Sequence, residues 1–475
     1  MNYEVIVFTC LTLSSMIGAG VLVVPNAVLP FGFAGTVGWV AASICSFVLA
    51  RMFVEIILSQ KTEASSGIPG IVKSEYSAQQ AFSVGFGQWL FICFGCSAVA
   101  LVFAKAFADL IGLSVPLFEF LLCIGAIGSL TVLYYFSTAA LGILSLLTIV
   151  KVILFSTTSI LGITEFNFIN FFGINKELPS DGNGMIATIK YAFTHVNGEP
   201  VSATKFLSYV FKSCSAALFA FAGMEAAASS SSSVKDPKNT IPKATVIAVI
   251  ACSLIFILTH ICVINALGDG KGPIPEAPVK TAVEILTKRH FGSALSSVMG
   301  NLFSILAMIG CFGSVMTFCF TAPNCLYDTI SIAYPDLKRR FPKSKSGFSI
   351  EAGIVSALVM SLIIFFYYFV NNNVSVILDY SVSLLISAYM KCALVHLKRR
   401  HNLSLSFAAL FVCFFYMSGC SLAAIVFGLV VSHIGNIIFL LLSREELGNQ
   451  LESGTPDGNS EECRRATEEE EHLAD

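Results

Sequence analysis

The chain has 475 residues, of which 55% are hydrophobic and only 12% are charged, and its mean hydropathy is +0.79. Soluble domains carry about 25% charged residues, so this composition excludes an ordinary water-soluble protein. The formal net charge of −2, without a basic face in the sequence, gives no indication of nucleic-acid binding.

The apolar residues fall into about twelve blocks long enough to cross a bilayer, for which a helix needs roughly 20 residues. The sequence therefore predicts an all-α, polytopic protein of the lipid bilayer with about twelve transmembrane helices. In chain order, the predicted spans are Val5–Leu29, Phe33–Leu58, Ser83–Gly112, Leu117–Phe136, Ala139–Ile163, Phe206–Ser231, Ile241–Leu267, Ser293–Thr321, Ser349–Phe369, Val374–Leu394, Leu403–Met417 and Leu422–Leu442.

The distribution of lysine and arginine predicts how these spans are oriented. With the N-terminus inside, most of the 28 Lys and Arg residues fall in cytoplasmic loops, and the opposite orientation would place them outside. Both termini are therefore expected in the cytoplasm. The polar and acidic segment 444–475 is expected to be a disordered cytoplasmic tail.

Two of the spans carry interruptions near their middle. Span 1 contains Gly18-Ala19-Gly20, and span 6 contains Phe221-Ala222-Gly223-Met224-Glu225. Each glycine costs about 1 kcal/mol in a helix interior, although either motif alone also suits a close helix–helix contact. The pair is more informative, because spans 1 and 6 begin two five-span blocks of opposite topology. Broken helices at corresponding positions of inverted repeats point to the central site of a transporter.

The same segments resemble a known family. Met16–Val21, followed by Pro25, looks like the span 1 motif of the amino acid–polyamine–organocation (APC) superfamily of permeases. Phe219–Glu225 and the polar tract Val234–Ala244 are similar to span 6 of that family and the loop after it, and a weaker similarity covers Tyr327–Pro342.

The resemblance implies a leucine-transporter-type fold of two inverted five-span repeats, plus two extra helices. The first repeat with its external loop would occupy 1–200, the second 201–400 and the extra spans 401–443. The distribution of the family, together with the absence of a cleavable signal, implies a multi-pass protein of a plasma membrane, with the bacterial inner membrane as the expected location.

The resemblance also assigns the expected binding residues. The backbone around Gly18, Ala19 and Gly20 would hold a substrate carboxylate. The carbonyls around Phe221, Ala222 and Gly223 would hold its amino group. Two aromatic residues, Phe219 in span 6 and Phe318 in span 8, would flank the substrate. Without the resemblance, each would be one lipid-facing or core ring among 41 phenylalanines.

Two ionisable residues are candidates for coupling or gating. Glu225 lies beside the break in span 6, where its carboxylate could form a gate or could accept hydrogen bonds from the second half-helix. Lys151 lies near the centre of span 5, too deep to reach the membrane surface easily. A buried lysine can lose its proton, so Lys151 is a candidate proton carrier, whereas a permanently charged structural brace is the alternative.

The predicted function is secondary active transport of an amino acid by alternating access, with proton coupling expected. An exchanger of amino acids or related amines and a transporter-derived amino acid sensor are the alternatives. Sodium is the less expected coupling ion, since Ser314 and Thr317 could serve it only if Lys151 does not occupy that place. No catalytic or metal-binding pattern occurs, so neither an enzyme nor a cofactor is expected.

The remaining polar pairs have structural interpretations. Lys105 and Asp109 are four residues apart in span 3 and could neutralise each other. Arg51 and Glu55 have the same spacing at the cytoplasmic end of span 2, where a solvated pair is expected.

Overall fold

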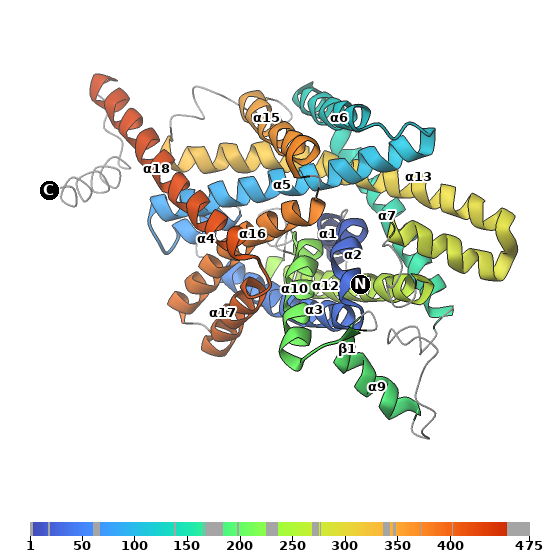
Figure 1. Cartoon of the computed structure of the whole chain (residues 1–475). Coiled ribbons are helices and arrows are strands. Elements are labelled where there is room, and N and C mark those ends of the chain that lie inside the picture. The colour runs from blue at the N-terminus through green and yellow to red at the C-terminus, as the bar shows by residue number, and fades with distance from the viewer. Residues whose placement is uncertain are drawn as a thin grey trace.

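The computed structural model describes residues 3–17, 20–59, 67–136, 139–164, 166, 184–196, 199–224, 236–267, 275, 277–335, 343–344, 348–371, 373–400 and 402–453. These residues form a bundle of long helices with a small two-stranded sheet at its edge (Figure 1). Within them, eight helices are long and apolar enough to cross a membrane, judged by length and composition. The prediction of an all-α polytopic membrane protein is therefore confirmed.

The helices of the first half follow the predicted spans closely. They are α1 (Tyr3–Met16), α2 (Gly20–Val28), η1 (Leu29–Phe31), α3 (Phe33–Leu58), α4 (Ile68–Lys73), α5 (Ala78–Ile111), α6 (Pro116–Phe136) and α7 (Ala139–Thr164). Span 1 is divided between α1 and α2, whereas α3 has the predicted bounds of span 2. The short helix α4 was not predicted, because its six residues are too few to show a periodic pattern.

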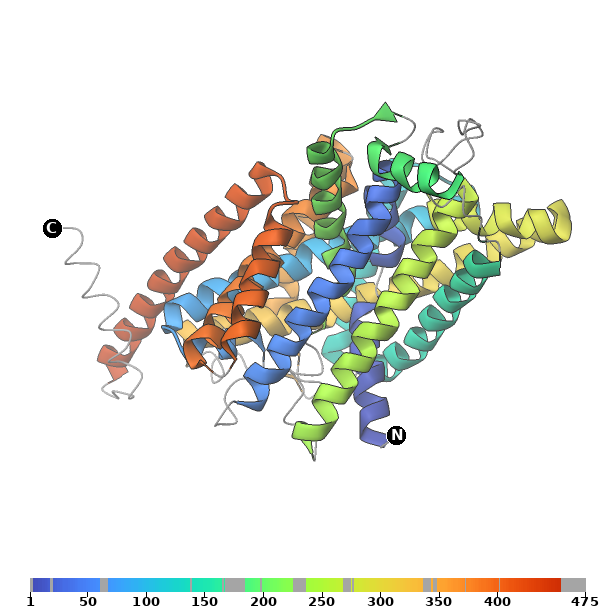
Figure 2. The same cartoon turned by 90° about the horizontal axis from the view of Figure 1, so that it is seen from below.

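The connection between spans 5 and 6 has local structure of its own. It contains α9 (Gly184–Thr194) and the antiparallel strands β1 (His195–Val196) and β2 (Glu199–Pro200). Figure 2 shows this segment at the end of the bundle away from the N-terminus. The Ser202 hydroxyl then caps the next helix by accepting the backbone N–H of Lys205 at 3.2 Å.

The second half contains α10 (Ala203–Phe221), α12 (Pro237–Leu267), α13 (Pro278–Ala333), α15 (Ile350–Phe366), η3 (Tyr367–Asn371), α16 (Val374–Arg399), α17 (Leu403–Met417) and α18 (Leu422–Ser453). The long helix α13 is bent at Gly292, which has φ 84° and ψ 174°. Span 8 was expected to begin just after this glycine. The structure adds a helical segment before Gly292, which begins at Pro278 and folds back on the rest of α13. The Ser296 hydroxyl donates to the carbonyl of Glu284 in this segment at 2.7 Å.

The last helix differs from the prediction for the C-terminal segment. Span 12 was expected to end at Leu442 and to be followed by a disordered tail over 444–475, but α18 continues to Ser453. The added residues include the strong helix formers Arg, Glu, Leu and Gln. Extending an existing helix also avoids the cost of nucleating a new one. Residues 454–475 lie outside the described part of the chain.

The centre of the bundle is formed by α5 and α13, which lie side by side across it (Figure 1). Small residues allow the close approach, as at Gly85, where a side chain would overlap with Thr329. The indole N–H of Trp89 in α5 donates to the hydroxyl of Ser356 in α15 at 3.0 Å. Tight packing and buried hydrogen bonds therefore fix α5, the helix against which the other central elements are placed.

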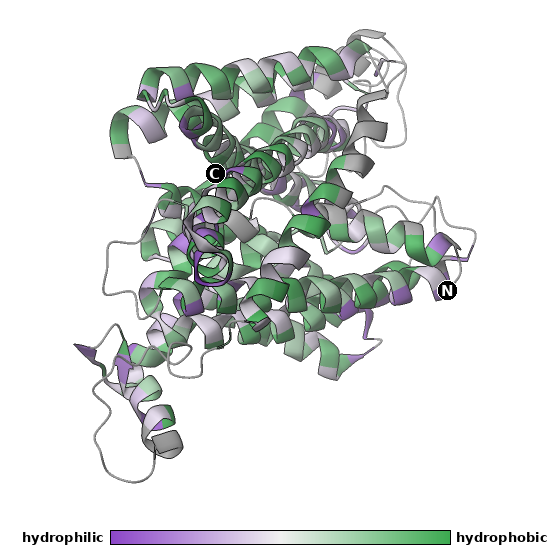
Figure 3. Cartoon of the chain, turned by 90° about the vertical axis from the view of Figure 1, so that its right-hand side faces the viewer, coloured by the Kyte–Doolittle hydropathy of each residue, from purple (hydrophilic) through white to green (hydrophobic). Residues whose placement is uncertain are grey.

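The surface of the long helices is largely apolar, and hydrophilic residues lie mainly at helix ends and connections (Figure 3). Large side chains such as Phe136, Leu422 and Leu429 are strongly exposed. In water such a surface would drive aggregation, whereas lipid chains cover it without cost.

We expect the packing of α3 on α10 to be sensitive at Gly38, because a side chain there would overlap with the Cβ of Ser213 and lie 3.0 Å from the backbone nitrogen of Cys214. Gly38→Val should lower the unfolding free energy by about 1–3 kcal/mol, as overpacking does. Gly125→Val is the matched control, since nothing lies within 4 Å of that position on α6. Thermal unfolding in detergent measures both variants, and equal melting temperatures would contradict the expectation.

Candidate functional site

The break predicted in span 1 is present. α1 ends at Met16, Ile17 forms a bend, and a new helix begins at Gly20. Gly18 and Ala19, the other two residues expected to hold the substrate carboxylate, lie outside the described residues. Ile17 is fully buried, so the bend lies inside the protein, the only place where an interrupted helix is tolerated in a membrane.

The break predicted in span 6 is present as well. α10 ends at Phe221, Ala222 has φ −58° and ψ 136°, and Gly223 has φ 99°. A positive φ of this size favours glycine, which explains the residue at this position. The N–H of Ala222 donates to the carbonyl of Phe219 at 3.4 Å, and the N–H of Met224 to that of Phe221 at 3.3 Å. Glu225, the predicted gating residue, lies outside the described residues.

The start of α2 is in direct contact with the last turn of α10. A Cβ built on Gly20 would lie 2.8 Å from the Cα and 3.0 Å from the Cβ of Ala220. Only a residue without a side chain lets the start of α2 approach the last turn of α10 this closely. The structure therefore brings Gly20, the described part of the predicted carboxylate segment, next to the turn of α10 that immediately precedes the segment predicted to bind the amino group.

The two predicted aromatic residues also converge, on α5. A Cβ at Gly95 would lie 3.4 Å from the Phe219 ring and 3.6 Å from the Phe318 ring. Phe219 further packs edge-on against Phe91, one turn earlier in α5, with ring centroids 6.4 Å apart. Sequence reasoning missed Gly95, because a single glycine inside an apolar span equally suits an ordinary helix–helix contact.

Phe221 has a different role from Phe219. Its side chain is fully buried and contacts the Phe256 ring of α12 at 5.2 Å and Trp39 of α3 at 6.4 Å between centroids. These contacts anchor the end of α10, and only the backbone of Phe221 remains available for the predicted contact. This is consistent with the prediction, which assigned the carbonyl groups of Phe221–Gly223 to the site.

Lys151 lies on α7 and is 2% exposed. Its ammonium donates to the Ser314 hydroxyl of α13 at 2.8 Å, and Ser314 donates to the carbonyl of Gly310 at 3.3 Å. Gly310 and Gly313 leave the space for the lysine stem, because a Cβ at these positions would lie 3.2 Å from Cγ and 3.5 Å from Cε of Lys151. Lys151 therefore links span 5 to span 8 and lies at the place where Ser314 could otherwise serve a sodium ion.

The environment of this ammonium is unusual for a cation. Among the described residues, no carboxylate lies within ion-pair distance of Lys151. A charged group buried without a counter-ion costs several kcal/mol. Ser314, which was also considered as a sodium ligand, is occupied by Lys151. The hydroxyl of Thr317, the second such residue, donates to the carbonyl of Gly313 at 2.9 Å.

Two neighbouring cavities lie at the end of the bundle where α2 ends and α17 turns into α18. Their volumes are about 130 and 710 Å³, and they share Asn26, Ser375 and Leu378. The larger one reaches Ala216 in α10, about one turn before Phe219. The larger cavity therefore ends about one turn of α10 away from the contact between Gly20 and Ala220.

Charged residues of the spans line these cavities. Lys105 and Asp109, predicted to neutralise each other, line the smaller one. The ammonium of Lys105 lies 5.8 Å from the Tyr367 ring centroid, and Asp109 accepts a hydrogen bond from the Ser114 hydroxyl at 2.9 Å. Asp379 in the larger cavity accepts the Ser421 N–H just before α18, with oxygens at 3.2 and 3.3 Å.

Comparison with known proteins finds distant relatives of this chain. The putrescine transporter PotE of Escherichia coli K12 is 21% identical over 467 residues, covering 94% of this chain and 97% of the relative. That of Haemophilus influenzae is 22% identical over 318 residues, covering 67% and 66%. The crystal structure of MhsT in complex with L-phenylalanine has a TM-score of 0.49 at 14% identity, over 92% of this chain and 98% of that one.

The comparison with protein families covers almost the whole chain. Residues 4–442 match the family described as amino acid permease, a range that includes both broken spans, Lys151 and the two central phenylalanines. The protein is therefore a transporter rather than an enzyme, and it belongs to the amino acid permease family.

Proposed function

We propose that the protein is a secondary active transporter that moves an amino acid across the membrane by alternating access. The observation that carries this proposal is the contact between the two broken spans at Gly20 and Ala220. The first turn of any helix has backbone N–H groups without intrahelical partners and a positive dipole end, so the start of α2 suits a carboxylate. The unwound residues after Phe221 offer carbonyl groups, which suit an ammonium group.

The coupling we propose is to protons. Lys151 supports it, because its ammonium is buried, has a hydroxyl group as its partner, and bridges α7 to α13. Loss of its proton would remove the cost of the buried charge and weaken the link between the two helices. Occupation of Ser314 by this lysine argues against sodium at the same place. A permanent brace remains the competing role.

Exchange of amines is the second candidate function. The relatives from Escherichia coli and Haemophilus influenzae are described as putrescine transporters, which favours a related amine as an alternative cargo. We prefer an amino acid, because a diamine has no carboxylate and would leave the start of α2 without an anionic partner.

We further propose the arrangement of the chain in the membrane. The two inverted repeats would occupy 1–200 and 201–400, followed by the two extra spans at 401–443. The Lys and Arg distribution supports cytoplasmic termini, in a bacterial inner membrane. The two cavities would then lie toward the external side of the membrane, and the C-terminal ends of α3 and α16 would face the cytoplasm.

The test of the function is uptake into proteoliposomes of labelled amino acids and of putrescine, with and without an inward proton gradient. We expect at least one amino acid to accumulate only when the gradient is present. Uptake that needs an internal substrate and ignores the gradient would indicate an exchanger. Binding without any flux would indicate a sensor and contradict transport.

For the coupling residue, Lys151→Ala should abolish the dependence of uptake on the proton gradient while substrate binding largely survives. The reason is that the buried ammonium would no longer gain or lose a proton. Lys190→Ala, which removes an exposed lysine of α9, is the control. Gradient-driven accumulation at the wild-type level in Lys151→Ala would exclude the coupling role and leave that of a brace.

For the binding site, Gly20→Ala should reduce uptake about tenfold or more, because the added methyl group cannot be accommodated against the backbone of Ala220 and moves the two breaks apart. Gly128→Ala, at an open position of α6, should leave uptake unchanged. Size-exclusion profiles establish that both variants are folded. Wild-type affinity in Gly20→Ala would remove this contact from the site.

A further inference from the structure

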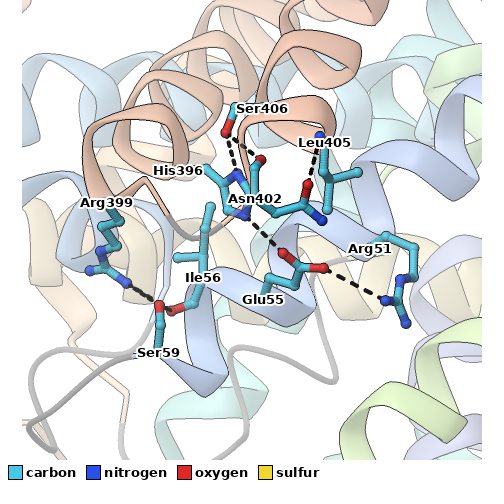
Figure 4. Close-up of polar contacts among 9 residues, drawn as sticks. All are labelled: Arg51, Glu55, Ile56, Ser59, His396, Arg399, Asn402, Leu405 and Ser406. Carbon is cyan, nitrogen blue, oxygen red and sulfur yellow. Dashed lines mark hydrogen bonds and ion pairs between the residues drawn. The ribbon is translucent and has the colours of Figure 1, made fainter.

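A polar cluster joins three helices at the end of the bundle opposite the two cavities. It connects the last turn of α3, the last turn of α16 and the start of α17 (Figure 4). The residues that follow α4 also join it, through Arg399. The sequence indicated only a solvated pair of Arg51 and Glu55 here. In the structure Arg51 lies 3.6 Å from one oxygen of Glu55, and the other oxygen contacts α16.

Arg399 is the first part of this cluster. Its side chain is only 9% exposed, and its guanidinium donates to the carbonyl of Ile56 and the hydroxyl of Ser59, both at 2.8 Å. It also donates to the hydroxyl of Ser74 at 2.7 Å and to the carboxylate of Glu75 at 2.9 Å. One side chain of α16 therefore ties the C-terminal end of α3 to the segment after α4, where a cation is also favoured by the helix dipole.

His396 is the second part, one turn earlier in α16 and 1% exposed. Its Nδ1 lies 2.7 Å from the hydroxyl of Ser406 in α17, and its Nε2 lies 3.3 Å from the carboxylate of Glu55 in α3. The Ser406 hydroxyl is also placed to donate to the carbonyl of Asn402 at 3.0 Å. The imidazole thus links α17 and α3 through two oxygen atoms.

The charge of the imidazole decides which hydrogen bonds His396 can donate. When Ser406 donates to Asn402, its oxygen needs a donor at Nδ1, and the Glu55 carboxylate needs a donor at Nε2. Only the doubly protonated ring supplies both. The neutral ring can meet both partners only if Ser406 turns its proton toward Nδ1, and its bond to Glu55 is then no longer between opposite charges.

The other charged groups around His396 have partners of their own. Arg51 shares Glu55 from within α3, and Arg399 binds Glu75. The ammonium of Lys398 donates to the carbonyl of Glu75 and lies 4.9 Å from the Tyr76 ring centroid. Among the described residues, Glu55 is the carboxylate within contact distance of the imidazole, and protonation of His396 strengthens the attraction between α16 and α3.

We propose that His396, Glu55 and Arg399 form a latch that holds the cytoplasmic end of the transporter closed and that tightens when the cytoplasm becomes acidic. The proposal rests on the transport function and orientation proposed above. In the proposed cycle, release of substrate inside would separate these helix ends and break the contacts of Arg399 and His396. An ordinary histidine changes charge between about pH 5 and 8, so internal pH would set how often the latch opens.

The experiment is exchange of labelled substrate in oriented proteoliposomes, with the external pH held at about 7 and the internal pH set to about 6 or 8. We expect wild-type exchange to be about fivefold slower at the acidic internal pH, because a charge-assisted hydrogen bond is roughly twice as strong as a neutral one. His396→Gln should lose this dependence, since glutamine keeps a hydrogen-bonding group but does not titrate. His433→Gln, at an exposed histidine of α18, should retain it.

Two additions separate the latch from transport itself. The first is to measure exchange at both internal pH values in Lys151→Ala as well. The dependence on internal pH should persist in this variant, which distinguishes the latch from the coupling residue. Hydrogen exchange of residues 51–59 and 396–406, corrected for the intrinsic effect of pH, reports latch opening even without flux. It should show greater protection at pH 6 in the wild type than in His396→Gln.

Either of two results would overturn the latch. The first is a wild-type rate that ignores internal pH, and the second is an unchanged dependence in His396→Gln. If His396→Gln does not fold, Ser406→Ala serves instead and should move the dependence to lower pH. A protein that moves no substrate refutes the proposed function alone, and hydrogen exchange then decides about the latch.

Discussion

The structure depends on one constraint of the bilayer, which is that every backbone N–H and C=O group within it needs a partner. An interrupted helix is possible only inside the protein, and an interruption is stable only when another element closes over it. Here the start of α2 lies against the last turn of α10, since Gly20 meets Ala220. At the second break, the carbonyls of Phe219 and Phe221 accept the N–H groups of Ala222 and Met224, so the turn supplies part of its own pairing.

The elements around this place are held by packing rather than by charge. Gly95 lets the rings of Phe219 and Phe318 reach α5, and Phe221 anchors the end of α10 between Trp39 and Phe256. Lys151 is the exception among the described residues near the centre of the bundle, a cation with a hydroxyl partner. A charge in an apolar, tightly packed region is energetically costly. Gain or loss of the proton on Lys151 would therefore change the local free energy considerably.

The two ends of the bundle have different chemistry. At one end, cavities of about 130 and 710 Å³ extend from the end of α2 toward α10. At the other end, Arg399 makes four hydrogen bonds and His396 links α3 to α17. In the proposed transport cycle, the end with the cavities would be open and the end with the polar cluster closed, as alternating access requires of one of its states.

The sequence by itself determined the class of the fold, the places of the spans and the two breaks. These follow from apolar length and from glycines within it, which are local properties. It did not reveal the continuation of α18 to Ser453, the bend of α13 at Gly292, or the role of Gly95. It also treated Glu55 as a solvated partner of Arg51, whereas His396, 341 residues away in sequence, shares that carboxylate. Contacts of this kind depend on how helices distant in the chain pack together, and only the tertiary structure decides which side chains then meet.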